Sequence, residues 1–181
     1  MKTFCSEAPL PGNPVDPNPI DIVFHLGRTR RFGGWGNPEW TVLHHSMLVT
    51  LLYLRSFTPN DAYHALLHDA HEAFTGDIPS PVKAAIGVEQ VHSLERHLDK
   101  RIYDMLCVDP PDDGAKFRVH MCDLAALFIE GYYFAPNGTF EHLREMDWPK
   151  LMLSEQRTII DLVLGIGLTN IAATMQGWIA T

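Results

Sequence analysis

One short segment of the sequence concentrates side chains that bind metal ions or transfer protons. The stretch ALLHDAHEAFTGDIPSPVK contains His68, Asp69, Glu72 and Asp77 beside apolar residues. Burying such groups costs free energy unless each finds a partner, and one divalent ion can satisfy several of them at once. The segment therefore indicates a metal site.

Two further segments offer metal ligands from apolar surroundings. His45 lies in VLHHSM and Asp123 in MCDLAALF. Together with His68 and Asp69 they form a set of imidazoles and carboxylates that suits Zn, Co, Mn, Fe or Mg and does not suit a thiophilic site. An ion in such a set lowers the pKa of water and polarises a phosphoryl oxygen. Glu72, one helical turn from His68, is placed to orient or deprotonate that water.

The remaining ligand-type residues have plainer explanations. His44 and His71 are expected to neighbour the ligands or the surface. Glu130, seven residues after Asp123, either supports a ligand or forms a helix salt bridge. Four histidines without matching partners are expected to be ordinary core or surface residues: His92, His97, His120 and His142.

A loop rich in glycine and arginine, GRTRRFGGWGNPEW, lies ahead of the first ligand histidine. Its four glycines would let the backbone approach a ligand. Its arginines, Lys83 and the metal would form a positive site in a chain of formal net charge −8. This charge argues against a nucleic-acid binder, which needs a basic surface, and leaves a small anionic ligand as the expected partner.

Helices are expected to position these groups. Apolar residues recur at helical spacing in five segments: 39 to about 55, 61 to about 74, 88–106, 115–134 and about 150–181. No stretch alternates apolar and polar residues for long enough to indicate a strand. Five prolines predict an extended arm over residues 1–20. We therefore predict one all-α domain over residues 1–181.

Composition limits the cellular setting. The 181 residues are long enough for one sizeable core. Three widely spaced cysteines without CxxC indicate neither a disulfide framework nor a thiolate metal site.

The N-terminus lacks the pattern of a secretion signal, and the apolar C-terminal tract is interrupted by Asp161 and glycines. We expect a cytoplasmic protein that does not bind membranes and that forms a homo-oligomer, a dimer or higher.

The ligand-type residues resemble a known family. His45, the pair His68-Asp69 and Asp123 resemble the H…HD…D signature of the HD-domain metal-dependent phosphohydrolases. HDAHEAFTGDIPSPVK resembles the HDxxExxxGDxPxPxK run of the 5'-deoxynucleotidase branch and its phage-encoded relatives, which include dATP triphosphohydrolases. The resemblance implies an all-helical HD-domain bundle in which His45, His68, Asp69 and Asp123 bind the ion.

The resemblance also implies roles for residues around the ion. Glu72 and Asp77 would take the acid/base and water-positioning roles. Arg31 and Lys83 would bind phosphate, while Phe32 would pack against the sugar and leave no room for a 2'-hydroxyl. The base pocket would be shaped by Gly34 or Trp35. The chain departs from many relatives at His44, where they have glutamate before the first ligand histidine.

The expected reaction is hydrolysis of the bond between the α-phosphorus and the 5'-oxygen of a 2'-deoxynucleotide. We favour a dNTP such as dATP, giving deoxynucleoside and triphosphate, in the host cytoplasm if the protein is phage-encoded. The alternative is a 5'-deoxynucleotidase acting on monophosphates. GDIPSPVK argues against a third enzyme class that acts on cyclic or signalling nucleotides. A non-catalytic, metal-stabilised nucleotide-binding module is the alternative from another class.

Overall fold

Helices form the regular structure of residues 19–134, the part of the chain that the computed structural model describes. Within this range the one β-type pairing is an isolated bridge between Arg30 and Thr41. The predicted all-α class is therefore confirmed. The elements are α1 (Pro19–Leu26), η2 (Arg31–Gly34), α2 (Val42–Ser56), η3 (Pro59–Asp61), α3 (Ala62–Leu67), α4 (Glu72–Thr75), α5 (Ser80–Ile86), α6 (Val88–Leu106) and α7 (Asp113–Tyr133).

The two predicted end segments fall largely outside the described residues. The C-terminal helix expected over about 150–181 lies wholly outside them, as do residues 1–18 of the expected arm. The prediction of an extended arm is wrong for its last two residues, because α1 begins at Pro19. Proline is favoured in the first turn of a helix, where its missing N–H has no intrahelical acceptor to lose.

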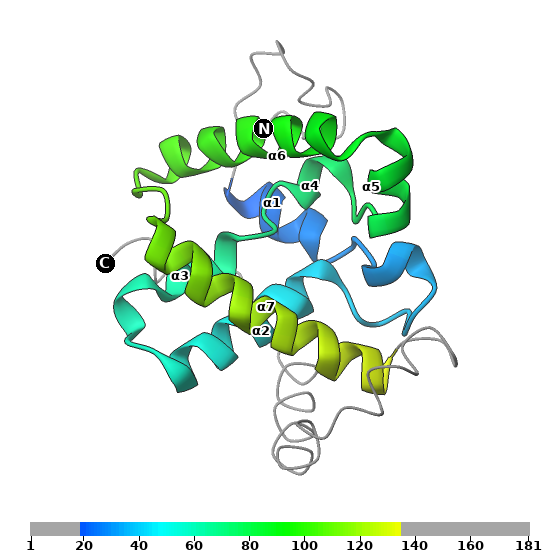
Figure 1. Cartoon of the computed structure of the whole chain (residues 1–181), viewed down its shortest axis with the longest axis horizontal. Helices are drawn as coiled ribbons and strands as arrows, with labels where there is room; N and C mark the ends of the chain where they lie inside the picture. The colour runs from blue at the N-terminus through cyan, green and yellow to red at the C-terminus, as the bar shows by residue number, and fades with distance from the viewer. Residues whose placement is uncertain (1–18, 135–181) are drawn as a thin grey trace.

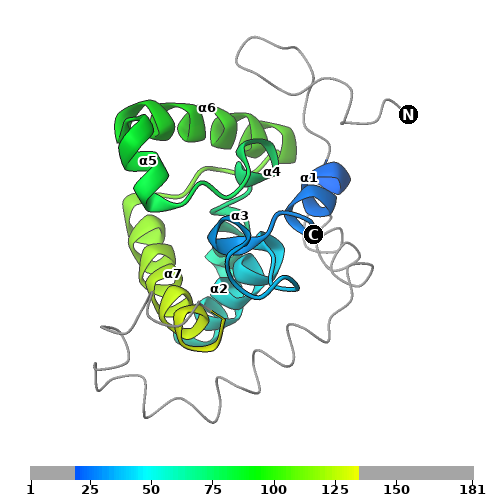
Figure 2. The same cartoon turned by 90° about the vertical axis from the view of Figure 1, so that its right-hand side faces the viewer.

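The long helix α2 lies at the centre of the described bundle. It packs against α3 and α7, while α5 packs against α6. Figure 1 shows α6 running across the top of the view and α7 crossing in front of α2. In Figure 2, turned by 90°, α1 and α7 lie on opposite sides of α2 and α3.

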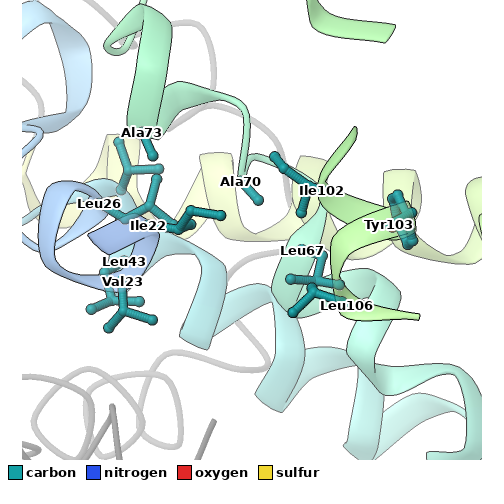
Figure 3. Close-up of a cluster of buried hydrophobic side chains, with 11 residues drawn as sticks. Ile22, Val23, Leu26, Leu43, Leu67, Ala70, Ala73, Ile102, Tyr103 and Leu106 are labelled. Atoms are coloured by element: carbon teal, nitrogen blue, oxygen red, sulfur yellow. The ribbon is translucent and has the colours of Figure 1, made fainter. Parts of the chain in front are cut away.

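Two clusters of buried apolar side chains hold these helices together. The first joins α1, α2, α6 and the segment after α3 (Figure 3), and includes Ile22, Leu26, Leu43, Ala70 and Ile102. The second joins α2, α3 and α7, and includes Trp40, Leu48, Tyr53, Val119 and Ala126. Since α2 contributes to both clusters, the buried positions between Leu43 and Leu48, His45 among them, are fixed from two sides.

The prediction of one continuous helix from 61 to about 74 is wrong. The chain leaves the α-helix after Leu67 and resumes it at Glu72. In between, the backbone N–H of Ala70 bonds to the carbonyl of Leu67, and that of Glu72 to the carbonyl of Asp69, both three residues back. The His68 ring nitrogen Nδ1 lies 2.8 Å from the Ala65 carbonyl oxygen. The side chain thus bonds the carbonyl that a continuing helix would use.

None of the helices within residues 19–134 combines the length and the apolar character needed to cross a bilayer. Both cysteines in this range, Cys107 and Cys122, are free thiols.

Asp112 caps the N-terminus of α7, the helix that carries Asp123 and Glu130. Its Oδ1 accepts a hydrogen bond of 2.6 Å from the backbone N–H of Ala115. We expect Asp112→Ala to lower the midpoint of urea denaturation, because the first turn loses its acceptor. Asp113→Ala is the matched control, since Asp113 is exposed and, among the described residues, pairs with Lys116. Equal losses in the two variants would contradict the capping role.

Candidate metal centre

Four side chains from α2, the turn after α3 and α7 converge on one point. His45 Nε2 lies 3.2 Å from His68 Nε2, 3.1 Å from Asp123 Oδ1 and 3.4 Å from Asp69 Oδ2. His68 Nε2 lies 3.3 Å from Asp69 Oδ2. The donor atoms of His45, His68 and Asp123 all fall within 4.8 Å of one another. The structure thus brings together the four residues that the sequence analysis named as ligands.

Both imidazoles use their far nitrogen for a hydrogen bond. His45 Nδ1 lies 2.7 Å from a Glu130 carboxylate oxygen, and His68 Nδ1 lies 2.8 Å from the Ala65 carbonyl. Carboxylates and carbonyls only accept, so each Nδ1 must donate its proton. When both rings are neutral, the two Nε2 atoms present lone pairs to each other across 3.2 Å. A cation satisfies this arrangement, and the four side chains could therefore hold a divalent ion.

The carboxylates of the cluster also attract protons to the imidazoles. Burial lowers the pKa of His68, but the neighbouring Asp69 and Asp123 outweigh burial and raise the pKa to about 9. Burial raises the pKa of Asp69, but His68, His45 and Arg31 outweigh it and hold that pKa well below its usual value. The carboxylates are therefore ionised and the imidazoles attract protons. Binding of an ion would displace these protons.

Glu130 on α7 orients His45 from behind. It is fully buried. Its Oε1 accepts hydrogen bonds from His45 Nδ1 at 2.7 Å and from Trp40 Nε1 at 2.9 Å. Burial raises the pKa of Glu130, but the positive charges of His45 and Arg31 outweigh it and lower the pKa. Of the two expectations for Glu130, the geometry agrees with contact to a candidate ligand, His45.

Glu72 lies beside the candidate ligand Asp69, and one of its carboxyl oxygens makes no hydrogen bond. The residue is 4% exposed, and its buried Oε2 has no hydrogen-bond partner. Burial, reinforced by the charges of Asp69 and Asp77, raises the pKa of Glu72 to about 9. The carboxyl is therefore protonated at neutral pH. A buried carboxyl with a free oxygen is suited to donating or accepting a proton in a neighbouring reaction.

Arg31 lies among three carboxylates. Its guanidinium nitrogens are 3.6 Å from Asp69 Oδ2, 3.7 Å from Asp77 Oδ1 and 3.4 Å from Glu130 Oε2. Burial alone would lower the pKa of Arg31, but these carboxylates raise it further above its usual value. Asp77 also accepts a 3.0 Å hydrogen bond from the backbone N–H of Gly33. Asp77 therefore ties the η2 loop to the segment that follows α4.

The η2 loop brings one aromatic ring to the site and leaves another exposed. The Arg31 guanidinium carbon lies 5.6 Å from the centroid of the Phe32 ring. Phe32 and Gly33 both have left-handed backbone, with φ of 57° and 60°. Gly34 also has a positive φ, of 85°. Trp35, expected as a base selector, is 81% exposed.

Lys83 reaches the ligand region through other side chains. Its Nζ lies 2.7 Å from Glu95 Oε1 on α6, and His71 Nε2 lies 3.7 Å from the same oxygen. His71 Nδ1 is 2.9 Å from Asp99 Oδ1. His71 is therefore a buried partner of α6 rather than a surface residue. Sequence reasoning did not single out Glu95 and Asp99, although their spacing of four on one helix face was a usable signal.

His44 and Trp40 have structural roles at the start of α2. The backbone N–H of Thr41 donates to His44 Nδ1 at 3.2 Å, while the Thr41 side chain accepts from the His44 N–H. This is a capping box in which histidine takes the usual place of glutamate. The His44 ring stacks on Trp40 at 5.4 Å between centroids. His44 thus stabilises the helix that carries His45.

The chain is similar over part of its length to two curated bacterial proteins. One, an uncharacterized protein of Rhodobacter capsulatus, is 40% identical over 93 residues, which cover 45% of this chain and 47% of that protein. The other, the uncharacterized protein YfdR of Escherichia coli K12, is 38% identical over 63 residues, or 35% of this chain and 33% of that protein. The matched region is thus less than half the length of either relative. No family model matches the chain.

The orientation of His45 by Glu130 predicts the effect of one substitution. Glu130→Gln should weaken binding of Co²⁺ or Zn²⁺ by roughly 10- to 100-fold, because the amide holds the His45 ring less strongly and makes it a poorer donor. The measurement is competition with a chromophoric chelator, with circular dichroism to verify the helical fold. The control Glu89→Gln removes an exposed carboxylate of α6. Unchanged affinity in a folded Glu130→Gln protein would contradict this role.

Proposed function

We propose that the protein is an HD-domain metal-dependent hydrolase of 2'-deoxynucleotides. The observation that carries the proposal is the convergence of His45, His68, Asp69 and Asp123 beside Glu72, whose buried Oε2 has no partner. A metal-binding set next to a proton-exchanging carboxyl is the minimum that hydrolysis by water requires.

The four ligands would hold Zn, Co, Mn or Mg. A bound ion of this kind supplies charge that polarises a phosphoryl oxygen and lowers the pKa of a water molecule. The four side chains do not determine which of these metals binds, because imidazole suits Zn and Co while carboxylate suits Mn and Mg.

Glu72 would exchange the proton. Its carboxyl is protonated at neutral pH, with a pKa of about 9, and can therefore donate to the 5'-oxygen that leaves phosphorus. A nearby cation favours the ionised carboxylate, so in its presence the same group can accept a proton from the attacking water. Asp77 would position the η2 loop through its bonds to Gly33 and Arg31.

The nucleotide part of the proposal rests on the η2 loop and on the motif resemblance. Arg31 would bind the phosphate that reacts, and Phe32, whose ring lies beside the guanidinium, would pack against the sugar. Lys83 would bind phosphate, while Gly34 and Trp35 would shape the base site. We favour a dNTP such as dATP as substrate, with a dNMP as the alternative, and a homo-oligomer in the cytoplasm.

A second candidate is a non-catalytic, metal-stabilised nucleotide-binding module. The observation that favours it is that the ligands come from three separate helical segments, so that an ion would hold these segments together. Under this alternative, chelation melts the fold and substitution of Glu72 has no catalytic consequence.

Product analysis distinguishes the candidates. Metal-loaded protein is incubated with dATP, dGTP, dAMP, dGMP and ATP, with a chelated sample as control. Deoxyadenosine and triphosphate from dATP, without turnover of ATP, are the expected products. Activity confined to monophosphates would identify a 5'-deoxynucleotidase. Absence of turnover with every metal would favour the binding module.

The role of Glu72 predicts the effect of an isosteric change. Glu72→Gln should give a folded protein whose rate of hydrolysis falls roughly a hundredfold or more, because the proton carrier is lost while the side-chain volume stays. The rate is measured at saturating metal and compared with the exposed control Glu89→Gln. A folded Glu72→Gln protein of normal activity would contradict the proton-exchange role of Glu72.

A further inference from the structure

A cavity of about 660 Å³ lies between α6 and α7 and reaches two of the candidate ligands. His68 and Asp123 line it, together with Leu67, Tyr103 and Val119. The volume is within the range of pockets that hold small ligands. Arg31 and Phe32 are not among its lining residues, so the cavity is distinct from the η2 loop that is proposed to hold the sugar.

Basic side chains line this cavity in two pairs. Arg96 and Lys100 are four residues apart on α6, and Lys116 and His120 are four residues apart on α7. Residues at this spacing share one helix face, so each helix presents a pair to the cavity. Apolar residues such as Leu67 and Val119 form part of the remaining lining.

The present partners of these cations are easily replaced. Lys100 pairs with Asp104 at 2.6 Å, and Lys116 pairs with Asp113 at 3.2 Å. Both pairs join side chains that are more than half exposed, where water screens the attraction. Arg96 is paired in the same way, with Glu89.

Among residues 19–134, two further carboxylates line the cavity besides the candidate ligand Asp123. Asp104 is bound to Lys100, and Asp99 is bound to His71 Nδ1 at 2.9 Å. Asp99 therefore keeps its own partner, while Asp104, whose side chain is more than half exposed, can return to water when Lys100 binds a more highly charged anion.

We infer that this cavity holds the phosphate chain of the substrate beyond the reacting phosphorus. The inference rests on the proposed function, which places the reacting phosphate at the ligand cluster and the sugar beside Phe32. The candidate ligands His68 and Asp123 and the two basic pairs line the same cavity. A triphosphate can reach Arg96, Lys100, Lys116 and His120, whereas a monophosphate ends at the ligands. The arrangement therefore selects nucleoside triphosphates.

Binding of inorganic tripolyphosphate tests the cavity directly. The full chain is loaded with Mn²⁺, dialysed, and titrated with tripolyphosphate and with orthophosphate by calorimetry. We expect the double variant Lys100→Gln and Lys116→Gln to bind tripolyphosphate roughly tenfold more weakly, since two partly screened charges are lost. Orthophosphate affinity should be unchanged. The glutamines keep part of the aliphatic stem, and both positions are exposed, so the fold is retained.

Arg55→Gln is the control, because Arg55 is an exposed cation of α2 that does not line the cavity. If tripolyphosphate binds no tighter than orthophosphate, or if the double variant binds it as tightly as the control, the inference is overturned. Binding is measured without turnover, so it decides the cavity's role whether or not a nucleotide is hydrolysed. Conversely, hydrolysis of dAMP by a protein that does not bind tripolyphosphate would retain the proposed chemistry and remove only the polyphosphate site.

Discussion

The buried carboxylate of Glu130 is the constraint around which the site is arranged. It accepts hydrogen bonds from His45 and Trp40 and lies 3.4 Å from Arg31, so it joins α7, the start of α2 and the η2 loop. An ionised carboxylate without partners is costly in a low-dielectric interior, and all three donors must therefore be in place when the bundle closes. The same contacts that satisfy Glu130 direct His45 Nε2 toward Asp123 and His68.

Four carboxylates gather around the candidate ligands within the described residues: Asp69, Asp77, Asp123 and Glu130. Arg31 contacts three of them, and protons drawn to His45 and His68 offset part of the remaining negative charge. Glu72 remains protonated because burial and two neighbouring carboxylates disfavour its ionised form. A divalent cation would replace the imidazole protons, and proton exchange at Glu72 would become sensitive to its presence.

Much of this site followed from residue types, whereas its supporting contacts did not. Histidines and carboxylates in apolar helices were sufficient to name His45, His68, Asp69 and Asp123. The break after Leu67 was missed because it depends on the His68 side chain bonding Ala65, which helical periodicity cannot show. Glu130 was ambiguous, since its partners lie 85 or more residues away. Periodicity likewise identified the faces of α6 and α7 but not that their basic pairs border one cavity.

The backbone of the η2 loop is strained at Phe32, where a residue with a side chain adopts a conformation that favours glycine. Phe32 holds a left-handed φ of 57°, a conformation that costs a residue with a Cβ about 1 kcal/mol more than glycine. Loop stability alone would favour glycine or asparagine at this position. A large aromatic ring is present instead, beside Arg31 and next to Gly33, whose amide is held by Asp77. The fold therefore keeps a large aromatic ring beside Arg31 in spite of the backbone strain, and strained positions of this kind cluster at functional sites of proteins.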